Sequence, residues 1–181
     1  MTDEEAINSE LNGKLHAALV EAAARWLFRQ RCSVVITEMA HGYTEHADAI
    51  GWSGTQSILV ECKASRSDFK ADAKKSFRQH FDGMGELRYY LTPKGMIRPS
   101  ELPPRWGLLE ISGRRVNRIV KARVCRSVNN RSEMSVLLST IRRMGNVPGG
   151  LRTGIGARFY LLDNTQRATV GTTPPKWTKS K

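Results

Sequence analysis

The spacing of hydrophobic residues in the first part of the chain predicts one helix followed by three strands. Residues 9–30 place their apolar side chains at helical intervals, with Ser9 as a candidate N-cap. Residues 33–39 and 57–64 are short runs rich in β-branched side chains, which is typical of strands. Residues 47–52 alternate weakly and are expected to form the strand between them, joined to 57–64 by a hairpin turn.

The remaining pattern predicts further elements of both kinds. Between residues 65 and 81 a phenylalanine or alanine recurs at every fourth position from Phe69, which favours a helix with one apolar stripe. The elements expected after it are a strand at 86–93, a pair of strands at 106–113 and 116–124, a helix at 132–144 capped by Ser132 or Asn130, and one more strand near 157–163. The last residues, from 166 on, are rich in Thr, Pro and Lys, which is typical of a flexible tail.

The order of these elements predicts an α/β or α+β fold in which helices flank a mixed central sheet. We expect one domain over residues 1–148, in the order αβββαβ with added C-terminal strands and a helix. A basic, partly flexible extension is expected over residues 149–181. A doubly wound nucleotide-binding fold is excluded, because three strands follow one another and no GxGxxG motif comes after the first of them.

The chain carries a strong excess of basic residues. Its 181 residues include 29 Lys and Arg against 17 Asp and Glu, which gives a formal net charge of +12. Such a surface attracts polyanions, of which nucleic acid is the commonest, although a solubilising surface or a ribosome-type protein would show the same balance. Aromatic residues make up 7% of the chain, and no stacking platform for single-stranded nucleic acid is indicated.

Cysteine usage and the absence of targeting signals predict a cytoplasmic protein of a bacterial or phage-infected cell. Cys32, Cys62 and Cys125 lie far apart and have no zinc-site spacing, which favours reduced thiols. The start of the chain is acidic and lacks the apolar core of a signal peptide. No run approaches the roughly 18 apolar residues that a membrane-spanning helix needs.

The predicted strand Ile58-Leu-Val-Glu-Cys-Lys carries two opposite charges, Glu61 and Lys63, in an otherwise apolar run. Because side chains alternate along a strand, both charges lie on the same face. Burying an unpaired charge costs on the order of several kcal/mol, so the fold must compensate for them. Either a structural ion pair or a strand end that opens into a cleft, where a cation meets the carboxylate, would do so.

A second carboxylate is expected beside Glu61. Asp48 lies in the preceding predicted strand, and adjacent antiparallel strands can bring such side chains together. Two carboxylates suit a hard cation such as Mg²⁺, which adds waters and substrate phosphate as ligands. Lys63 would then stand beside a metal-bound water, where it could orient or deprotonate that water and offset negative charge on a phosphate. The pattern therefore predicts hydrolysis of a phosphodiester.

These residues also resemble a known signature. Asp48, followed after 12 residues by Glu61-Cys62-Lys63, resembles the D-X(n)-E-X-K motif of the PD-(D/E)xK nuclease superfamily. The expected element order is similar to the restriction-endonuclease-like core of that superfamily. Ala47 stands where the name of the superfamily implies a proline.

The run "ECKASRSDFKAD" is similar in style to the MmcB-like DNA repair group within this superfamily. The specific part of the resemblance covers residues 46–72, and the looser part covers residues 10–125. The resemblance implies a nuclease that depends on Mg²⁺ or Mn²⁺ and acts on DNA. It implies that Asp48, Glu61 and the backbone carbonyl of Cys62 bind the metal, while Lys63 assists the attacking water.

The resemblance further implies an acid contributed by the first helix. Glu21, near the centre of that helix, is the candidate for a catalytic and metal-binding role. Glu38, at the end of the first predicted strand, is its competitor. Either residue could instead be an ordinary exposed side chain, and so could His46, which lies close enough to Asp48 in sequence to contact a substrate.

Basic residues after the charged strand and around the later hairpin are candidates for contact with the DNA backbone. They are Arg66, Lys70, Lys74, Lys75, Arg78, Arg114 and Arg115. A charged helix face can also be simply solvated, and Asp68 is expected to act as the N-cap of its helix. Each phosphate contact would steepen the loss of affinity with salt.

Three functions fit these observations. The first is a metal-dependent nuclease in DNA repair, recombination or phage DNA processing, for which a homodimer is expected because relatives that cut two strands are commonly dimeric. The second is a catalytically inactive DNA- or RNA-binding module on the same fold. The third is a structural or assembly protein in which Glu61 and Lys63 form an ordinary ion pair.

Overall fold

A computed structural model describes residues 3–38, 46–73, 75, 83–145 and 158–161. In chain order the elements are α1 (Asp3–Arg29), β1 (Val34–Thr37), β2 (Ala49–Ser53), β3 (Gln56–Cys62), α2 (Arg66–Ala73), β4 (Leu87–Pro93), the 3₁₀ helix η1 (Pro99–Glu101), β5 (Gly107–Ser112), β6 (Arg115–Val120), α4 (Asn130–Gly145) and β7 (Arg158–Leu161). The predicted order of helix, three strands, helix and strand is confirmed, and so is the α+β class.

The strands form one mixed sheet in the order β6-β5-β4-β3-β2-β1-β7. The meander β1–β2–β3 is antiparallel, whereas β3, β4 and β5 run parallel to one another. Parallel neighbours need a crossover connection, and α2 belongs to the connection between β3 and β4. This crossover leaves the carboxyl end of β3, which is where Glu61 and Lys63 lie.

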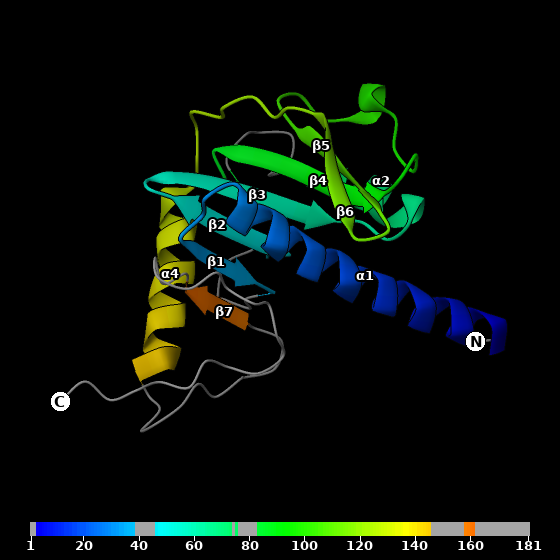
Figure 1. Cartoon of the computed structure of the whole chain (residues 1–181), viewed down its shortest axis with the longest axis horizontal. Coiled ribbons are helices and arrows are strands. Elements are labelled where there is room, and N and C mark those ends of the chain that lie inside the picture. Colours follow the sequence, from blue (N-terminus) through cyan, green and yellow to red (C-terminus); the bar gives the residue numbers. More distant parts are fainter. Residues whose placement is uncertain (1–2, 39–45, 74, 76–82, 146–157, 162–181) are drawn as a thin grey trace.

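Helices cover both faces of the sheet (Figure 1). On one face, the apolar stripe of α1 packs on alternate strand residues that include Ala49 and Val60. On the other face, their neighbours Ile50 and Leu59 pack with side chains of α2 and α4. Because successive residues of a strand point to opposite faces, α1 lies on one side of the sheet while α2 and α4 lie on the other.

The first helix is longer than predicted. α1 begins at Asp3, so Ser9 lies inside the helix and is not its cap. Residues 3–5 read Asp-Glu-Glu, and acidic residues favour a helix N-terminus because they complement its dipole. This acidic start explains why the helix extends beyond the apolar periodicity.

The caps of α2 and α4 also differ from the predicted ones by a few residues. The Ser65 hydroxyl accepts a hydrogen bond from the backbone N–H of Asp68 at 3.2 Å, so Ser65 caps α2 and Asp68 is free of that role. The side-chain oxygen of Asn129 accepts a hydrogen bond from the backbone N–H of Ser132 at 3.0 Å. Asn129 therefore caps α4 in place of Asn130 or Ser132.

Part of the segment 149–181 belongs to the same sheet as the rest of the chain. β7 pairs antiparallel with β1, with Tyr160 opposite Val35. The additional strand predicted near residues 157–163 is thus present and forms an edge of the sheet. The predicted flexible tail from residue 166 lies outside the described residues.

The three cysteines are buried, and none of them forms a disulfide. Burial raises the pKa of Cys32 to about 12, which leaves its thiol protonated at neutral pH. None of the helices described here is long and apolar enough to cross a membrane.

A buried carboxylate fastens α4 to the sheet. Glu133, in the first turn of α4, accepts hydrogen bonds from the indole N–H of Trp52 at 3.1 Å and the hydroxyl of Ser57 at 2.8 Å. It also accepts a hydrogen bond from the backbone N–H of Gly85 at 2.8 Å. Gly85 has a φ of 85°, a left-handed conformation that glycine adopts without strain. One side chain therefore joins α4 to β2, β3 and the segment that leads into β4.

We expect Glu133→Ala to lower the free energy of unfolding by about 3 kcal/mol, because three buried donors lose their acceptor. Glu133→Gln should cost less, since its carbonyl oxygen can still accept from Ser57 and Gly85. Urea denaturation followed by circular dichroism measures both changes. Glu10→Gln, on an exposed turn of α1, is the control and should stay within about 0.5 kcal/mol of the parent chain. A Glu133→Ala protein of unchanged stability would contradict this account.

Candidate active site

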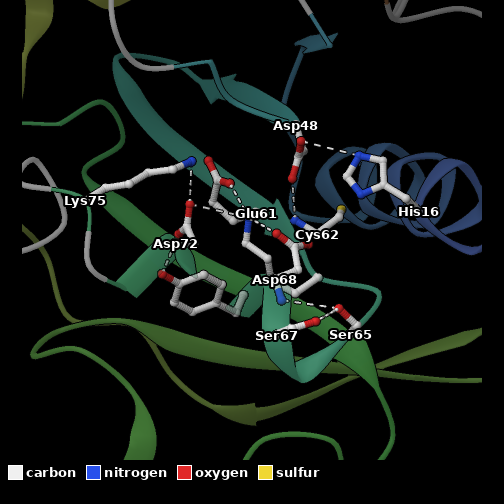
Figure 2. Close-up of polar contacts among 11 residues, drawn as sticks. His16, Asp48, Glu61, Cys62, Ser65, Ser67, Asp68, Asp72 and Lys75 are labelled. Atoms are coloured by element: carbon white, nitrogen blue, oxygen red, sulfur yellow. Dashed lines mark hydrogen bonds and ion pairs between the residues drawn. The ribbon is translucent and has the colours of Figure 1, made fainter. Parts of the chain in front are cut away.

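The charged strand ends in a cluster in which one buried ammonium group lies among three carboxylates (Figure 2). The Nζ atom of Lys63 lies 3.2 Å from Oε2 of Glu61, 3.4 Å from Oδ1 of Asp72 and 3.9 Å from Oδ1 of Asp68. Lys63, Glu61 and Asp72 are buried, whereas Asp68 is partly exposed. The two opposite charges of the strand therefore meet, and α2 adds two acids to them.

Lys63 keeps its proton in this cluster. Burial, which leaves 6% of the side chain exposed, would by itself lower the pKa of Lys63. The negative charges of Glu61, Asp72, Asp48 and Asp68 outweigh burial and raise that pKa well above its ordinary value. An ammonium group that stays protonated is a fixed positive charge. Of the two roles considered for Lys63, this favours the stabilisation of negative charge over the deprotonation of a water molecule.

Asp72 is held by contacts with three side chains. Its Oδ2 atom accepts a hydrogen bond from the hydroxyl of Tyr90 on β4 at 2.8 Å. Its Oδ1 atom lies 2.8 Å from Nζ of Lys75, in addition to the contact with Lys63. These contacts position α2 against the carboxyl ends of β3 and β4.

Asp48 reaches the same strand end from the start of β2. The β2–β3 pairing ends with Ala49 opposite Val60, and Asp48 is the residue just before this paired part of β2. The Oδ2 atom of Asp48 accepts a hydrogen bond from the backbone N–H of Cys62 at 2.8 Å. This hydrogen bond brings Asp48 to the strand end that carries Glu61.

The side chain of α1 that reaches Asp48 is His16. Its Nε2 atom lies 3.5 Å from Oδ1 of Asp48. This contact raises the pKa of His16 above its ordinary value, although burial acts in the opposite direction. Figure 2 shows His16 and Asp72 approaching the strand end from opposite sides. The site is therefore built from both helical layers.

Glu21, the acid predicted from α1, lies elsewhere on that helix. It follows His16 by five positions, which corresponds to about 140° around the helix axis and about 7.5 Å along it. Its carboxylate lies 3.7 Å from Nη1 of Arg25, one turn further on. The structure thus brings His16 to Asp48 and pairs Glu21 with Arg25, and the metal-binding role of Glu21 stays a prediction.

The competing acid, Glu38, lies at the same edge as the cluster. Its backbone N–H donates to the carbonyl of Asp48 at 3.1 Å. The pKa of His16 is raised first by Asp48 and additionally by the charge of Glu38. Of the two acids considered, Glu38 is therefore the one within electrostatic reach of the site. His46, which precedes Asp48, is exposed.

Arg66, predicted to contact DNA, is engaged within the protein. Its guanidinium donates to the carbonyl of Met96 and forms an ion pair with Glu101. The hydrogen bond from Arg66 lowers the pKa of Glu101 to about 2. Arg66 thereby ties the start of α2 to η1, and its contact with nucleic acid stays a prediction.

The other basic residues predicted to contact DNA occupy two surface regions. Lys70 and Lys75 are exposed along and just after α2, and Lys75 pairs with Asp72. Arg114 and Arg115 are exposed at the turn between β5 and β6. Lys74 and Arg78 lie outside the described residues.

The oxygen atoms at this strand end are of the type that a hard divalent cation prefers. Asp48 and Glu61 supply carboxylates, and the backbone carbonyl of Cys62 would add a neutral oxygen. Within the described ranges, no group of three or more His, Cys, Asp or Glu side chains is arranged to hold a metal ion. Two carboxylates suffice for Mg²⁺, which usually keeps several waters. The cluster's acids also outnumber Lys63 and Lys75, so the site is locally negative in a chain of charge +12.

Sequence reasoning missed His16 and Asp72. Each lies on the buried stripe of its helix: His16 precedes Leu19 and Ala23 by three and seven positions, and Asp72 follows Phe69 by three. A titratable residue in register with an apolar stripe faces the core, and that periodicity was the available signal. The sequence pattern could therefore have ranked both above Glu21.

We expect Lys63→Met to lower the free energy of unfolding by about 3–5 kcal/mol at neutral pH, because Glu61 and Asp72 lose their shared buried cation. Adding Glu61→Gln should recover part of this loss, since the double variant buries one negative charge fewer. Urea unfolding measures both changes. Lys94→Met, at an exposed position after β4, is the control. Equal stability of the Lys63→Met and parent proteins would show that the cation does not hold the cluster together.

Comparison with known proteins identifies one protein of similar fold, whose function is unknown. No protein-family model and no curated protein matches the chain. Among solved structures, the chain is similar to a protein of unknown function from Silicibacter pomeroyi, with a TM-score of 0.53 and 20% sequence identity. The match covers 74% of this chain and 94% of that one. At this level of identity the likeness shows the fold alone.

Proposed function

We propose that the protein is a metal-dependent nuclease that hydrolyses phosphodiester bonds in DNA during repair, recombination or phage DNA processing. The observation that carries the proposal is the buried Glu61–Lys63 pair at the end of β3, with Asp48 held at the same strand end by the hydrogen bond that it accepts from the Cys62 N–H. These are the residues on which the resemblance to the PD-(D/E)xK nucleases rests. We also propose a cytoplasmic location, where reducing conditions suit three cysteines that form no disulfide.

Asp48, Glu61 and the backbone carbonyl of Cys62 would hold Mg²⁺ or Mn²⁺. When bound, such an ion lowers the pKa of a coordinated water and offsets negative charge on a phosphate. The hydrogen bond from the Cys62 N–H fixes one carboxylate oxygen of Asp48, and His16 contacts the other. Asp48 is therefore oriented by groups of the protein itself.

Lys63 supplies a permanent positive charge at the strand end. Its raised pKa keeps it protonated, and the carboxylates of Glu61 and Asp72 hold its side chain in one place. A preorganised cation stabilises charge that develops on a phosphate during hydrolysis. The basic surface of the chain would attract the DNA backbone toward this locally acidic site.

We expect the purified protein to cleave DNA in Mg²⁺ or Mn²⁺ and to leave it intact in EDTA. Asp48→Asn should reduce the cleavage rate by about 10²-fold or more, because it removes a charged ligand. The asparagine keeps an oxygen for the Cys62 N–H, so the fold should survive. Gel electrophoresis of labelled duplex, nicked, branched and single-stranded DNA measures cleavage. Glu10→Gln, an acid removed from an exposed turn of α1, should cleave normally.

Metal binding is measured in parallel, to distinguish a variant that has lost a metal ligand from a variant that has unfolded. Calorimetry with Mn²⁺ should show binding to the parent and Glu10→Gln proteins and none to Asp48→Asn, while thermal unfolding confirms that all three are folded. Cleavage that persists in both Asp48→Asn and Lys63→Ala would rule out this site.

A catalytically inactive nucleic-acid-binding module is the second candidate. The close pairing of Lys63 with Glu61 and Asp72 favours it, and so does the lack of a three-ligand group among the described side chains. Salt-sensitive binding of DNA or RNA without cleavage in any metal would support this candidate. If neither metal nor nucleic acid binds at low salt, the Glu61–Lys63 pair is an ordinary ion pair of a structural protein.

Substitution of Arg114 or Arg115, at the β5–β6 turn, tests the DNA-binding surface. The test applies to a nuclease and to an inactive binding module alike. Replacing one of them with alanine should weaken binding to all DNA sequences alike and reduce the slope of log K against log salt by about 0.9. Fluorescence anisotropy over a salt series measures the slope, and Ser112→Ala, an exposed neighbour, is the control. Unchanged slopes in both arginine variants would exclude this turn from the interface.

A further inference from the structure

The N-terminal half of α1 extends past the sheet as a helical arm (Figure 1). We call residues 3–15 the α1 arm. Its residues Ile7, Leu11 and Leu15 recur at every fourth position, which aligns them along one side of the helix, and they are 36–59% exposed. Single exposed apolar residues are common on proteins, but a row of them marks a contact surface. The α1 arm thus carries an apolar stripe that the sheet does not cover.

α4 carries a second stripe on the side that faces away from the sheet. Val136 and Thr140 are buried, whereas Met134, Leu138 and Ile141 are 50–59% exposed. Spacings of four and three residues place the latter three on one side of the helix, and we call them the α4 stripe. The apolar part of the α1 arm spans about 12 Å and the α4 stripe about 10.5 Å, so the two match in length.

The charges that accompany the two stripes are opposite. The α1 arm contains the acids Asp3, Glu4, Glu5 and Glu10, with Lys14 as its basic residue, while α4 contains Arg131, Arg142 and Arg143. The acid of α4, Glu133, is buried against the sheet. Contact between two arms, or between two α4 helices, would bring like charges together. Contact between an arm and an α4 helix brings opposite charges together, which favours that pairing.

The two stripes of one chain cannot meet. α1 packs on the sheet face of Ala49 and Val60, whereas α4 packs on the face of Ile50 and Leu59. α1 is one continuous helix from Asp3 to Arg29, so the arm follows the direction of the part that lies on the sheet. An α4 stripe within reach of the arm therefore belongs to another molecule.

We propose that the protein forms a homodimer in which the α1 arm of each chain docks on the α4 stripe of the other. An antiparallel approach of the two helices sets the acidic start of the arm against the end of α4 that carries two arginines in sequence. One such contact, with three apolar side chains from each helix, is smaller than the roughly 1,200 Å² of a stable interface. Two reciprocal contacts are needed, so the dimer dissociates on dilution. This pairing does not depend on the proposed nuclease activity.

The experiment measures molar mass by sedimentation equilibrium over a range of protein concentrations. The parent chain is expected to dimerise, and Leu11→Lys or Leu138→Glu should each raise the apparent Kd at least about tenfold, because a charge enters the apolar contact. Both side chains are half exposed or more, so the fold is retained, as circular dichroism would confirm. Ala17→Lys, about 120° from the stripe of the arm, and Ser112→Glu are the matched controls and should dimerise like the parent.

A mixture of the two variants identifies the partners. The Leu11→Lys chain keeps its α4 stripe and the Leu138→Glu chain keeps its arm, so a mixed dimer has one intact contact. In its second contact the introduced lysine meets the introduced glutamate, and these opposite charges attract. An equimolar mixture should therefore recover a dimer that neither variant forms alone. A parent chain that remains monomeric overturns the proposal. So does a dimer disrupted by only one of the two substitutions, since arms would then pair with arms or α4 with α4. A mixture that stays monomeric overturns it as well.

Discussion

The contact of the Lys63 ammonium with Glu61 and Asp72 is the interaction on which this strand end depends. Two buried carboxylates without a cation between them would be costly, and a buried ammonium without carboxylates would be equally so. Because Asp72 belongs to α2, the same contact joins β3 to the start of its crossover. The contact that compensates the buried charges therefore also holds α2 beside β3. Tyr90 of β4 supports it by donating a hydrogen bond to Asp72.

Two kinds of buried acid occur in this fold, and their partners distinguish them. Glu133 accepts hydrogen bonds from Trp52, Ser57 and Gly85, so neutral donors satisfy it and its effect is to attach α4. Glu61 and Asp72 instead face a cation, and Asp48 and Asp68 stand beside them with partial exposure. A carboxylate cluster that is compensated by charge and partly exposed at Asp48 and Asp68 suits the binding of a further cation, which is why chemistry is proposed there and not at Glu133.

The two helical layers contribute differently to the molecule. α2 and α4 complete one face of the sheet, and α2 brings acids to the site. α1 covers the opposite face, reaches Asp48 through His16 and continues beyond the sheet as the arm. One rigid helix thus links the candidate site to the surface proposed for self-association, so both depend on how α1 packs on the sheet.

The sequence by itself determined the order of the elements and the shared face of Glu61 and Lys63, because apolar periodicity, turn residues and strand alternation are local properties. It also indicated Asp48, since a short hairpin leaves few registers. The apolar periodicity of α1 indicates that His16 faces the sheet, but only the tertiary structure decided that it meets Asp48, because that contact depends on where Leu19 and Ala23 pack on the sheet. It likewise decided that Asp72 pairs with Lys63, because that contact exists only once the crossover has folded back beside β3.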